Sequence, residues 1–535
     1  MSAGVRSGSA RALEFWEIGI ICAGPSASGP APIGRLGGAV HVPDDWRPVV
    51  SALPDEPLAP DWLPVPEDAN ALPEAIWPAS AVRGDDGALR LAGVSVATLR
   101  ERFGTPLYVL DEGEVRAHAR RILAAFAAAA ADHGTIARVY YAGKAFLSAE
   151  VARWVAEEGL GVDVCSRGEL ELALAAGVEP ARIGFHGNNK RVSELERAVT
   201  AGIGTIIVDS LVEIERLSAI AERTGRTQPV LLRVNSGVHA ETHDFLATAH
   251  EDQKFGFPLD DAPAAAARIR ELPGLSLLGL HCHIGSQIFG AAGFAESASR
   301  VVELHARLLA DGDLPLLNLG GGFGIAYTVA DDPTPIEELS AAIVDAVARE
   351  CEVRGIALPE LAFEPGRSVI GQAGVTLYEI GTTKPVALGE RGSRLYVSVD
   401  GGMSDNARPA LYGAQYSARI ASREAGGEPV LVRVVGSHCE SGDVVVEHEY
   451  LPGDVAPGDL LAVPATGAYC HALASNYNHT PRPAVVAVRG GEARVIVRGE
   501  TIDDLLGRDA GLAAPAPHAS TNDHETGRRA GEGEA

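Results

Sequence analysis

The chain has 535 residues, which is enough for about three domains at the usual ~150 residues each. Hydrophobic residues make up 46% and charged residues 22%, an ordinary globular composition that excludes a wholly disordered or fibrous chain. Lysine and arginine number 45 against 71 aspartates and glutamates, and the resulting net charge of −26 opposes generic binding to nucleic acid or to an anionic membrane.

The two ends of the chain are predicted to be poorly ordered. Residues 1–80 contain about a dozen of the 33 prolines and show little apolar periodicity. Residues 510–535 are small, polar and charged, as in a frayed tail. The six cysteines are dispersed and form no CxxC pair, and no run of about 18 apolar residues occurs. We therefore expect no disulfide framework, no zinc knuckle, no membrane helix and a cytoplasmic location.

Between these ends, eight short β-rich runs alternate with helix-like stretches. The runs are ARVYYA (137–142), GVDV (161–164), RIGFHG (182–187), TIIVDS (205–210), VLLRVN (230–235), LLGLHCHIGS (277–286), LLNLGGG (316–322) and LAFEPGR (361–367). Helical spacing of apolar residues occurs at 148–158, 190–201, 211–223 and 335–354. The alternation predicts a parallel sheet, and eight such units close into a (β/α)8 barrel of the TIM type, which we place at residues 113–368.

From about Val369 the pattern becomes β-rich, with alternating strands separated by Gly or Pro. These strands lie in VTLYEIGTTKPV, RLYVSVD, PVLVRVVG, DLLAVPA and RPAVVAVRGGEARVIVRGE. We predict a second domain at 369–509, with a sandwich-like or barrel-like β architecture. Residues 81–112 precede the barrel, but the strand Thr105–Leu110 is expected to join this second domain.

Functional groups are concentrated where the barrel runs end, and this is the end of the fold that carries active sites. They are Lys144 after the first run, His186 after the third, His281, His283 and Ser286 in the sixth, Gly320, Gly321 and Gly322 in the seventh, and Glu364 and Arg367 in the eighth. The glycine run lets backbone amides approach an anion, and Arg367 matches phosphate oxygens.

Together with this phosphate cradle, Lys144 indicates pyridoxal 5'-phosphate. Lysine forms a Schiff base with an aldehyde, and the apolar sequence around Lys144 is expected to desolvate its amine. Glu364 is then expected to face the pyridine nitrogen and keep it protonated. His281 and His283 point to the same side of a strand, but the neighbouring sequence offers no third ligand, so we expect no metal. An imidazole stacked on the cofactor ring is the better interpretation of His283, while Ser286 could hydrogen-bond the phosphate.

Eight ordered motifs resemble those of the fold-type III pyridoxal-phosphate decarboxylases, and the set is most similar to the diaminopimelate decarboxylase family. They are YAGKAF, HGNNK, HCHIGSQI, LGGGFGI, EPGR, VDGGMSDNARPALYGA, HCESGD and TGAYCHALASNYN. The resemblance covers roughly residues 75–508. The N-terminal extension and residues 249–257 look like actinobacterial members of the family.

The resemblance implies roles for individual residues. Catalytic roles fall to Lys144, His283, Glu364 and Cys439. Cofactor contacts fall to Lys144, His283, Ser286, Gly320, Gly321, Gly322, Glu364, Gly366, Arg367 and Tyr469. Substrate contacts fall to Arg367, Arg408, Tyr412, Glu440 and Tyr469. In this family the residues matched by Cys439 and Glu440 reach into the partner's site. The resemblance therefore implies a homodimer with a shared active site, in which Cys439 donates the proton.

The implied reaction is decarboxylation of meso-2,6-diaminopimelate to L-lysine and CO2, the last step of lysine biosynthesis. The alternatives are an ornithine, arginine or carboxynorspermidine decarboxylase, a racemase of the same barrel fold, or a non-catalytic cofactor-binding protein. Glu440 and Arg408 argue against the ornithine and arginine enzymes. The sequence departs from the family at Phe146, Arg167 and Ser236, and the last two leave the geometry of their loops open.

Overall fold

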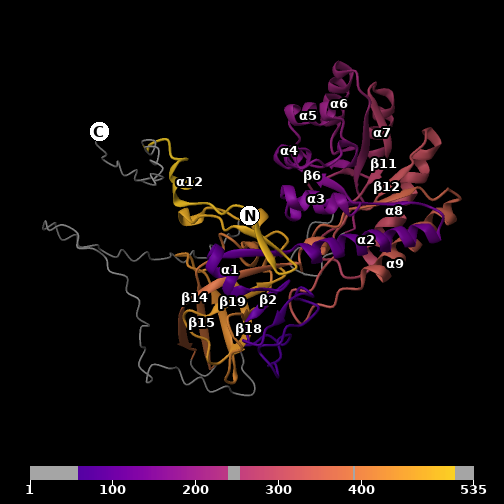
Figure 1. Cartoon of the computed structure of the whole chain (residues 1–535). Helices are drawn as coiled ribbons and strands as arrows, with labels where there is room; N and C mark the ends of the chain where they lie inside the picture. The colour runs from indigo at the N-terminus through magenta and orange to yellow at the C-terminus, as the bar shows by residue number, and fades with distance from the viewer. Residues whose placement is uncertain (1–57, 239–252, 389–391, 513–535) are drawn as a thin grey trace, which may run out of the picture. The chain divides into compact units, whose positions relative to one another are not determined.

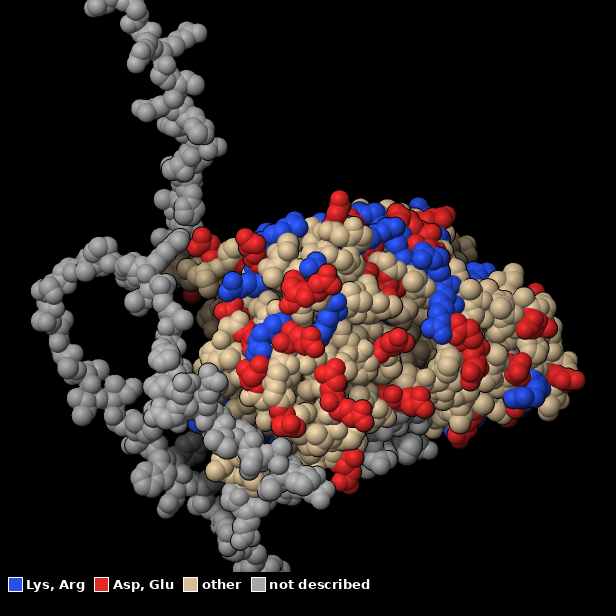
Figure 2. Space-filling view, turned by 60° about the horizontal axis from the view of Figure 1, so that its bottom comes forward, with Lys and Arg blue, Asp and Glu red and all other residues tan. Residues whose placement is uncertain are grey.

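The computed structural model describes residues 58–238, 253–388 and 392–512, and the expected architecture is present in them. Figure 1 shows the helices of the barrel around its strands, and β14, β15 and β19 of the second sheet side by side. Among the described helices, none combines the length and the apolar sequence needed to cross a bilayer. Acidic and basic side chains are interspersed over the face seen in Figure 2.

Eight parallel strands form the barrel, each hydrogen-bonded to the next, and β13 returns to pair with β5. The strands are β5 (Ala137–Ala142), β6 (Gly161–Val164), β7 (Ile183–Phe185), β8 (Thr205–Val208), β9 (Gln228–Asn235), β11 (Leu275–His281), β12 (Leu316–Asn318) and β13 (Glu360–Phe363). A short strand, β10 (Phe257–Pro258), pairs with β9. Strands β6 and β8 are buried throughout, as expected of parallel strands covered on both faces. The predicted barrel is confirmed.

Serine caps start three of the helices immediately after the loops at the active end of the barrel. The hydroxyl groups of Ser148, Ser166 and Ser210 accept hydrogen bonds from backbone amides in the first turns of α3, α4 and α6. The helices of the barrel are α2 (Glu112–Asp132), α3 (Ala149–Glu157), α4 (Arg167–Ala175), α5 (Val192–Ala201), α6 (Leu211–Thr224), α7 (Ala262–Glu271), α8 (Ala292–Leu308), α9 (Ile336–Arg354) and α10 (Arg367–Ile370). The caps fix where each loop ends, and therefore where its functional side chains lie.

The second domain is built around a nine-stranded sheet. Its strands are β4 (Leu107–Asp111), β14 (Gly374–Ala387), β15 (Ser393–Val399), β16 (Arg419–Ile420), β17 (Pro429–Val435), β18 (Val444–Pro452), β19 (Leu460–Pro464), β20 (Val485–Arg489) and β21 (Glu492–Val497). Strand β4 pairs antiparallel with β14 and parallel with β20, so the expected crossing of the chain into this sheet before the barrel is confirmed. Strands β16 and β18 were not predicted. Helices α11 (Arg408–Tyr412) and α12 (Ile502–Leu506) accompany the sheet.

Part of the N-terminal extension is packed, contrary to the prediction of poor order for residues 1–80. Ile76 and Trp77 are buried in a cluster with Val109 and Val375 of the second sheet. Leu63 is buried against another part of the same sheet. Proline-rich composition indicated disorder, but a few large apolar residues supply enough burial to order the segment. A small sheet of β1 (Val82–Arg83), β2 (Leu89–Leu91) and β3 (Val94–Ser95) follows, and then helix α1 (Val96–Phe103). Residues 1–57 and 513–535 lie outside the described residues.

Candidate active site

Lys144 lies on a 3-10 turn, η2 (Gly143–Ala145), directly after strand β5. A side chain at Gly143 would come within 2.8 Å of the carbonyl oxygen of Asp163, so the turn requires glycine there. The hydroxyl of Tyr141 donates to the carbonyl of Phe146 at 2.6 Å, and this bond links the end of β5 to the residue after the turn. The neighbours of Lys144 are buried, but Lys144 is exposed. The expected desolvation of its amine by apolar neighbours was therefore wrong: the turn buries its backbone and leaves the amine open.

Glu364, directly after β13, is the centre of a buried polar cluster. Its Oε1 accepts a hydrogen bond from Asn318 Nδ2 at 2.7 Å, and His281 Nε2 donates to its Oε2 at 3.3 Å. His186 Nε2 lies 3.3 Å from Oε1. Burial opposes ionisation, but the imidazoles of His186 and His281 outweigh it and hold the pKa of Glu364 well below its usual value. Glu364 is therefore a fixed negative charge at the active end of the barrel.

Asp163, near the end of β6, is a second buried carboxyl group in this cluster and behaves in the opposite way. Its Oδ1 lies 3.4 Å from His186 Nε2, and its Oδ2 has no hydrogen-bond partner. Burial and the nearby charge of Glu364 raise the pKa of Asp163 well above its usual value. The pKa values of the two carboxyl groups are therefore shifted in opposite directions. Environments that separate two carboxyl groups in this way are typical of active sites.

The glycine run follows β12 and fits between two other loops of the site. A side chain at Gly321 would overlap the carbonyl oxygen of Glu364. Gly322, with a φ of +111°, has room for no side chain because Gly285 lies 2.5 Å from the position of its Cβ. The amide of Gly321 donates to His283 Nδ1 at 3.2 Å. Burial, followed by the nearby ammonium of Lys144, lowers the pKa of His283 well below its usual value, so this imidazole is neutral. The sequence-predicted groups Lys144, His283, Glu364 and the glycine run therefore lie together.

Arg367 begins α10 and is held by three side chains. Its Nη2 donates to Ser286 Oγ at 2.9 Å, and its Nη1 donates to the hydroxyl of Tyr327. Its guanidinium lies 4.8 Å from the ring centre of Tyr469, which comes from the second domain. The amide of Tyr469, where φ is +63°, donates to the carbonyl of Ala145 at 2.7 Å. The second domain therefore touches both Arg367 and the turn that carries Lys144.

Arg408, the first residue of α11, is buried beside Arg367. Its guanidinium lies 4.5 Å from the ring centre of Tyr327 and donates to the hydroxyl of Tyr416. Tyr327 thus contacts both arginines, one through its hydroxyl and one through its ring face. Within the described residues, neither arginine has an ion-pair partner. A buried cation without a partner is costly, so this pair is suited to receive anionic groups from a ligand.

The other predicted site residues of the second domain are exposed. Cys439 and Glu440 lie on the connection from β17 to β18, and Tyr412 is 63% exposed at the end of α11. The hydrogen bonds of the Glu440 carboxylate go to Ser441 and Gly442, within its own loop. Gly366 lies at the base of the site, where a side chain would come within 3.0 Å of Ala142 Cβ.

Four residues of the site were not predicted from the sequence. They are Asp163, Asn318, Tyr327 and Tyr416. Asn318 is the last residue of β12 and Asp163 is the only acid in the GVDV run, so polar residues in barrel strands were an available signal. Tyr327 and Tyr416 lie in irregular segments, and nothing in their surroundings marks them.

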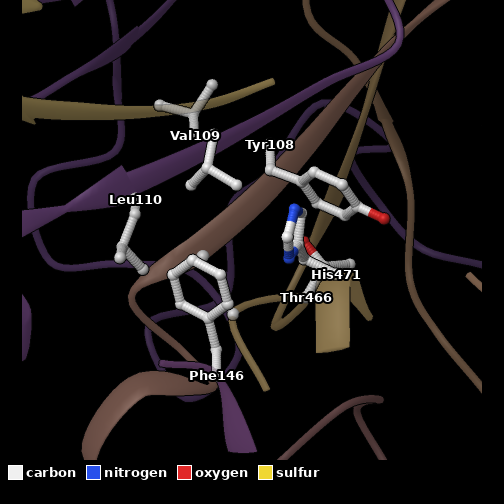
Figure 3. A pocket seen from close by; sticks show the side chains of 9 residues that line it. Tyr108, Val109, Leu110, Phe146, Thr466 and His471 are labelled. Atoms are coloured by element: carbon white, nitrogen blue, oxygen red, sulfur yellow. The ribbon is translucent and has the colours of Figure 1, made fainter. Parts of the chain in front are cut away.

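The structure accommodates each departure from the family motifs. Ser236 is buried, and its hydroxyl accepts from Ser297 Oγ at 2.9 Å. Arg167 begins α4, and its amide donates to Glu194 Oε1 at 3.1 Å. Phe146 contacts the His471 ring edge-on at 5.1 Å. Figure 3 shows these two rings with Tyr108 around a cavity of about 10 Å³, which has room for roughly one water. This cavity lies at the joint between the Lys144 turn and the second domain.

A third possible metal ligand lies near His281 in space but not in the sequence. Ligand atoms of His186, His281 and Glu364 lie within 4.8 Å of one another, although they come from three different strands. Two of these groups already hydrogen-bond each other, which accounts for the cluster without an ion. That the site holds no metal stays a prediction.

Comparisons with known proteins agree with this geometry. The family described as "Pyridoxal-dependent decarboxylase, pyridoxal binding domain" matches residues 113–371. The diaminopimelate decarboxylase of Mycobacterium tuberculosis is 50% identical over 439 residues, which are 81% of this chain and 97% of that protein. That of Bacillus subtilis is 45% identical over 427 residues, 79% of this chain and 95% of that protein.

Solved structures give the same result. A diaminopimelate decarboxylase from M. jannaschii in complex with L-lysine has a TM-score of 0.75 and 31% identity, covering 81% of this chain and 98% of that one. The enzyme of Helicobacter pylori with L-lysine has a TM-score of 0.69 and 28% identity, covering 77% of this chain and 98% of that one.

Proposed function

The chain belongs to the diaminopimelate decarboxylase family, and from this membership we propose that it converts meso-2,6-diaminopimelate to L-lysine and CO2, the last step of lysine biosynthesis. It is a carboxy-lyase that depends on pyridoxal 5'-phosphate and acts on an amino acid. The assignments of individual residues below are proposals.

The residues at the active end of the barrel fit this cofactor. The amine of Lys144 is open to react with an aldehyde, and the ionised Glu364 suits a protonated ring nitrogen. The glycine run and Arg367 suit a phosphate. Around Glu364, His281 Nδ1 and Asp163 Oδ2 are buried without hydrogen-bond partners. When bound, pyridoxal phosphate withdraws electrons from the substrate carbon that loses its carboxylate.

The protein residues set the charge around the reacting atoms. Lys144 would hold the aldehyde group of the cofactor, and the ionised carboxylate of Glu364 would favour a proton on its ring nitrogen. His283 is neutral and can lie against the ring without repelling that proton. Burial and the charge of Glu364 raise the pKa of Asp163 and so favour its protonated form. A bound cofactor would therefore meet the charge of Glu364 beside its ring nitrogen.

The observation that carries the choice of substrate is the pair of guanidinium groups on either side of Tyr327. Arg367 and Arg408 supply two cations for two anions, the phosphate of the cofactor and the distal carboxylate of the substrate. Ornithine and arginine have no distal carboxylate. They would leave Arg408 buried and unpaired, and a buried unpaired charge is strongly disfavoured. The geometry therefore favours a dicarboxylic amino acid.

The site is proposed to be completed by a second copy of the chain. Cys439 and Glu440 are exposed on a loop of the second domain, as expected of groups that act outside their own subunit. In the homodimer, Cys439 is proposed to deliver the proton that replaces CO2, and Glu440 to bind the second amino group of the substrate. A cytoplasmic location stays a prediction.

A substrate panel tests this proposal. The protein is incubated with pyridoxal phosphate and, separately, with meso-diaminopimelate, L-ornithine, L-arginine and L-lysine, and released CO2 and the amino-acid product are measured. We expect CO2 from diaminopimelate alone, with L-lysine in equal amount. Faster release from ornithine or arginine would refute the proposed specificity.

A further inference from the structure

The loop that carries Cys439 and Glu440 is fixed by a buried carboxylate. Asp443 is 3% exposed, and each of its oxygens binds the backbone of a different segment. Its Oδ1 accepts from the amide of Met403 at 2.6 Å, and its Oδ2 accepts from the amide of His438 at 2.7 Å. Asp443 therefore joins the residue just before Cys439 to the turn formed by residues 401–404.

Two glycines make room for this carboxylate. A side chain at Gly402 would come within 2.5 Å of Asp443 Oδ1, and one at Gly436 would overlap the same carboxylate. Gly402 has a φ of +156°, so its conformation also favours glycine. Because backbone surrounds the carboxylate so closely, a longer or differently shaped side chain at position 443 cannot be accommodated without moving the loop.

Further contacts close the loop at its base. The amide of Gly436 donates to the carbonyl of Asp443 at 3.0 Å, and the amide of Ser437 donates to the carbonyl of Gly401 at 2.9 Å. His438 Nε2 lies 2.8 Å from Ser404 Oγ. His438 is buried, whereas Ser437 and the tip of the loop, Cys439 to Gly442, are exposed. The loop is therefore rigidly mounted on the 401–404 turn, and that turn leads directly into Arg408.

We propose that Asp443 is a positioning residue, which holds Cys439 and Glu440 in the geometry that the partner's active site requires. The inference rests on the proposed function and deepens it. The carboxylate of Asp443 binds the backbone amides of Met403 and His438, so it acts through the loop. Displacement of a reacting group by about 1 Å is enough to lower a rate by roughly 10²-fold. The loop serves the partner, so loss of Asp443 damages the partner's site rather than the site of its own subunit.

The first test is Asp443→Asn. The amide keeps the size of the side chain but presents an NH2 group to one of the two backbone amides, so the loop is released from one side. We expect kcat to fall by about 10²-fold and KM to rise, because Glu440 shifts together with Cys439, with little change in the visible spectrum of the bound cofactor. The solvent deuterium isotope effect on kcat is expected to rise, because proton delivery becomes slower. A normal kcat would overturn the proposal.

The matched control is Asp504→Asn. Asp504 also accepts a backbone amide, from Thr501, but it caps the exposed helix α12. Its replacement is expected to leave kcat unchanged. If Asp443→Asn does not fold, as judged by circular dichroism, Ser404→Ala replaces it, since this removes the tether of His438 and leaves the Asp443 carboxylate in place. A reduced kcat for Ser404→Ala supports the proposal, and a normal one contradicts it.

Mixing subunits locates the defect. In a hybrid of Asp443→Asn and Lys144→Ala subunits, one site combines an intact Lys144 with an intact loop, so activity should recover. A hybrid of Cys439→Ala and Lys144→Ala subunits is the control. Its activity recovers only if Lys144 of one subunit works with Cys439 of the other. If the second mixture recovers and the first does not, Asp443 acts within its own subunit and the proposal is overturned. If neither recovers although subunits exchange, the shared site itself is refuted and the inference falls with it.

Discussion

The two domains contribute to the active site in different ways. In the barrel, Glu364, His283 and the glycine run lie together in a single chain, mostly buried, with their charges fixed by neighbours. In the second domain, Arg408 and Tyr469 reach the same site, but Cys439 and Glu440 are exposed and contact only their own surroundings. The residues proposed to hold the cofactor therefore lie together in one chain. The residues proposed to select the substrate and deliver the proton are divided between this site and an exposed loop, which is proposed to act in a partner subunit.

The largest effect is expected from Lys144→Ala, which removes the amine proposed to hold the aldehyde. Activity and the visible absorption of the protein-bound cofactor should both disappear, as measured by CO2 release and by absorption spectroscopy. Lys384→Ala, on an exposed part of β14, is the matched control and should retain both. Retention of the bound-cofactor spectrum by Lys144→Ala would break the assignment of the barrel half.

Cys439→Ala is expected to slow turnover by orders of magnitude while the cofactor spectrum survives, because it affects only the shared half. Mixed in equal amounts with Lys144→Ala, it should recover about a quarter of wild-type activity, because half of the dimers are hybrids with one intact site of two. Subunit exchange is checked by co-purification of differently tagged chains. If activity does not recover although the subunits exchange, Cys439 acts in the active site of its own subunit.

Tyr327→Phe tests the contact where the two halves meet. Phenylalanine keeps the ring face for Arg408 but removes the hydroxyl that accepts from Arg367. Because Arg367 is proposed to bind the phosphate of the cofactor, we expect the affinity for pyridoxal phosphate to fall about tenfold, since a hydrogen bond to a charged group contributes roughly 1.5–3 kcal/mol. Tyr416→Phe removes the equivalent acceptor of Arg408, which is proposed to bind the distal carboxylate, and should instead raise KM for diaminopimelate with a smaller change in kcat. A large fall in kcat with unchanged KM would contradict a role in substrate binding.

The smallest effect concerns pH. Burial lowers the pKa of His186 to about 4, so this imidazole is neutral above that pH and protonates only below it. Glu364 stays ionised in the same range. The acid limb of kcat/KM should therefore fall near pH 4 rather than near 6.5, the ordinary pKa of histidine. Cys439→Ala should not change the pH at which kcat/KM falls on the acid side, because this decrease is attributed to His186 in the barrel. A limb near 6.5 would show that His186 is protonated in the working enzyme.

Most of the barrel and its site could be predicted because both follow from local patterns. The eight apolar runs define the strands, and chemistry in a barrel collects where strands end, which places Lys144, Glu364 and Arg367 together. Contacts between distant irregular segments could not be predicted in this way. Tyr327 meets Arg408 only because the second domain folds against the barrel, and no spacing in the sequence encodes that contact.

The sequence also did not predict the pKa shifts of the buried acids or the ordering of part of the N-terminal extension. Asp163 and Glu364 are both acids in barrel runs, and only their burial and neighbours raise the pKa of one and lower the pKa of the other. Trp77 lies in a proline-rich segment, and its burial depends on Val109 and Val375, which are far along the chain. Composition predicts the average behaviour of a segment, whereas a single large side chain can order it.

The pairing of β4 with β14 and β20 has a consequence for how the chain is made. Strand β4 leaves the ribosome before the barrel, but its two partners are synthesised after it, the second close to the end of the chain. The strands of the barrel are consecutive in the chain, so the barrel can form first. Until β14 and β20 have been synthesised, the backbone groups of β4 remain unpaired. The β domain is therefore completed last, and any truncation that removes β20 leaves the first strand of that sheet open to aggregation.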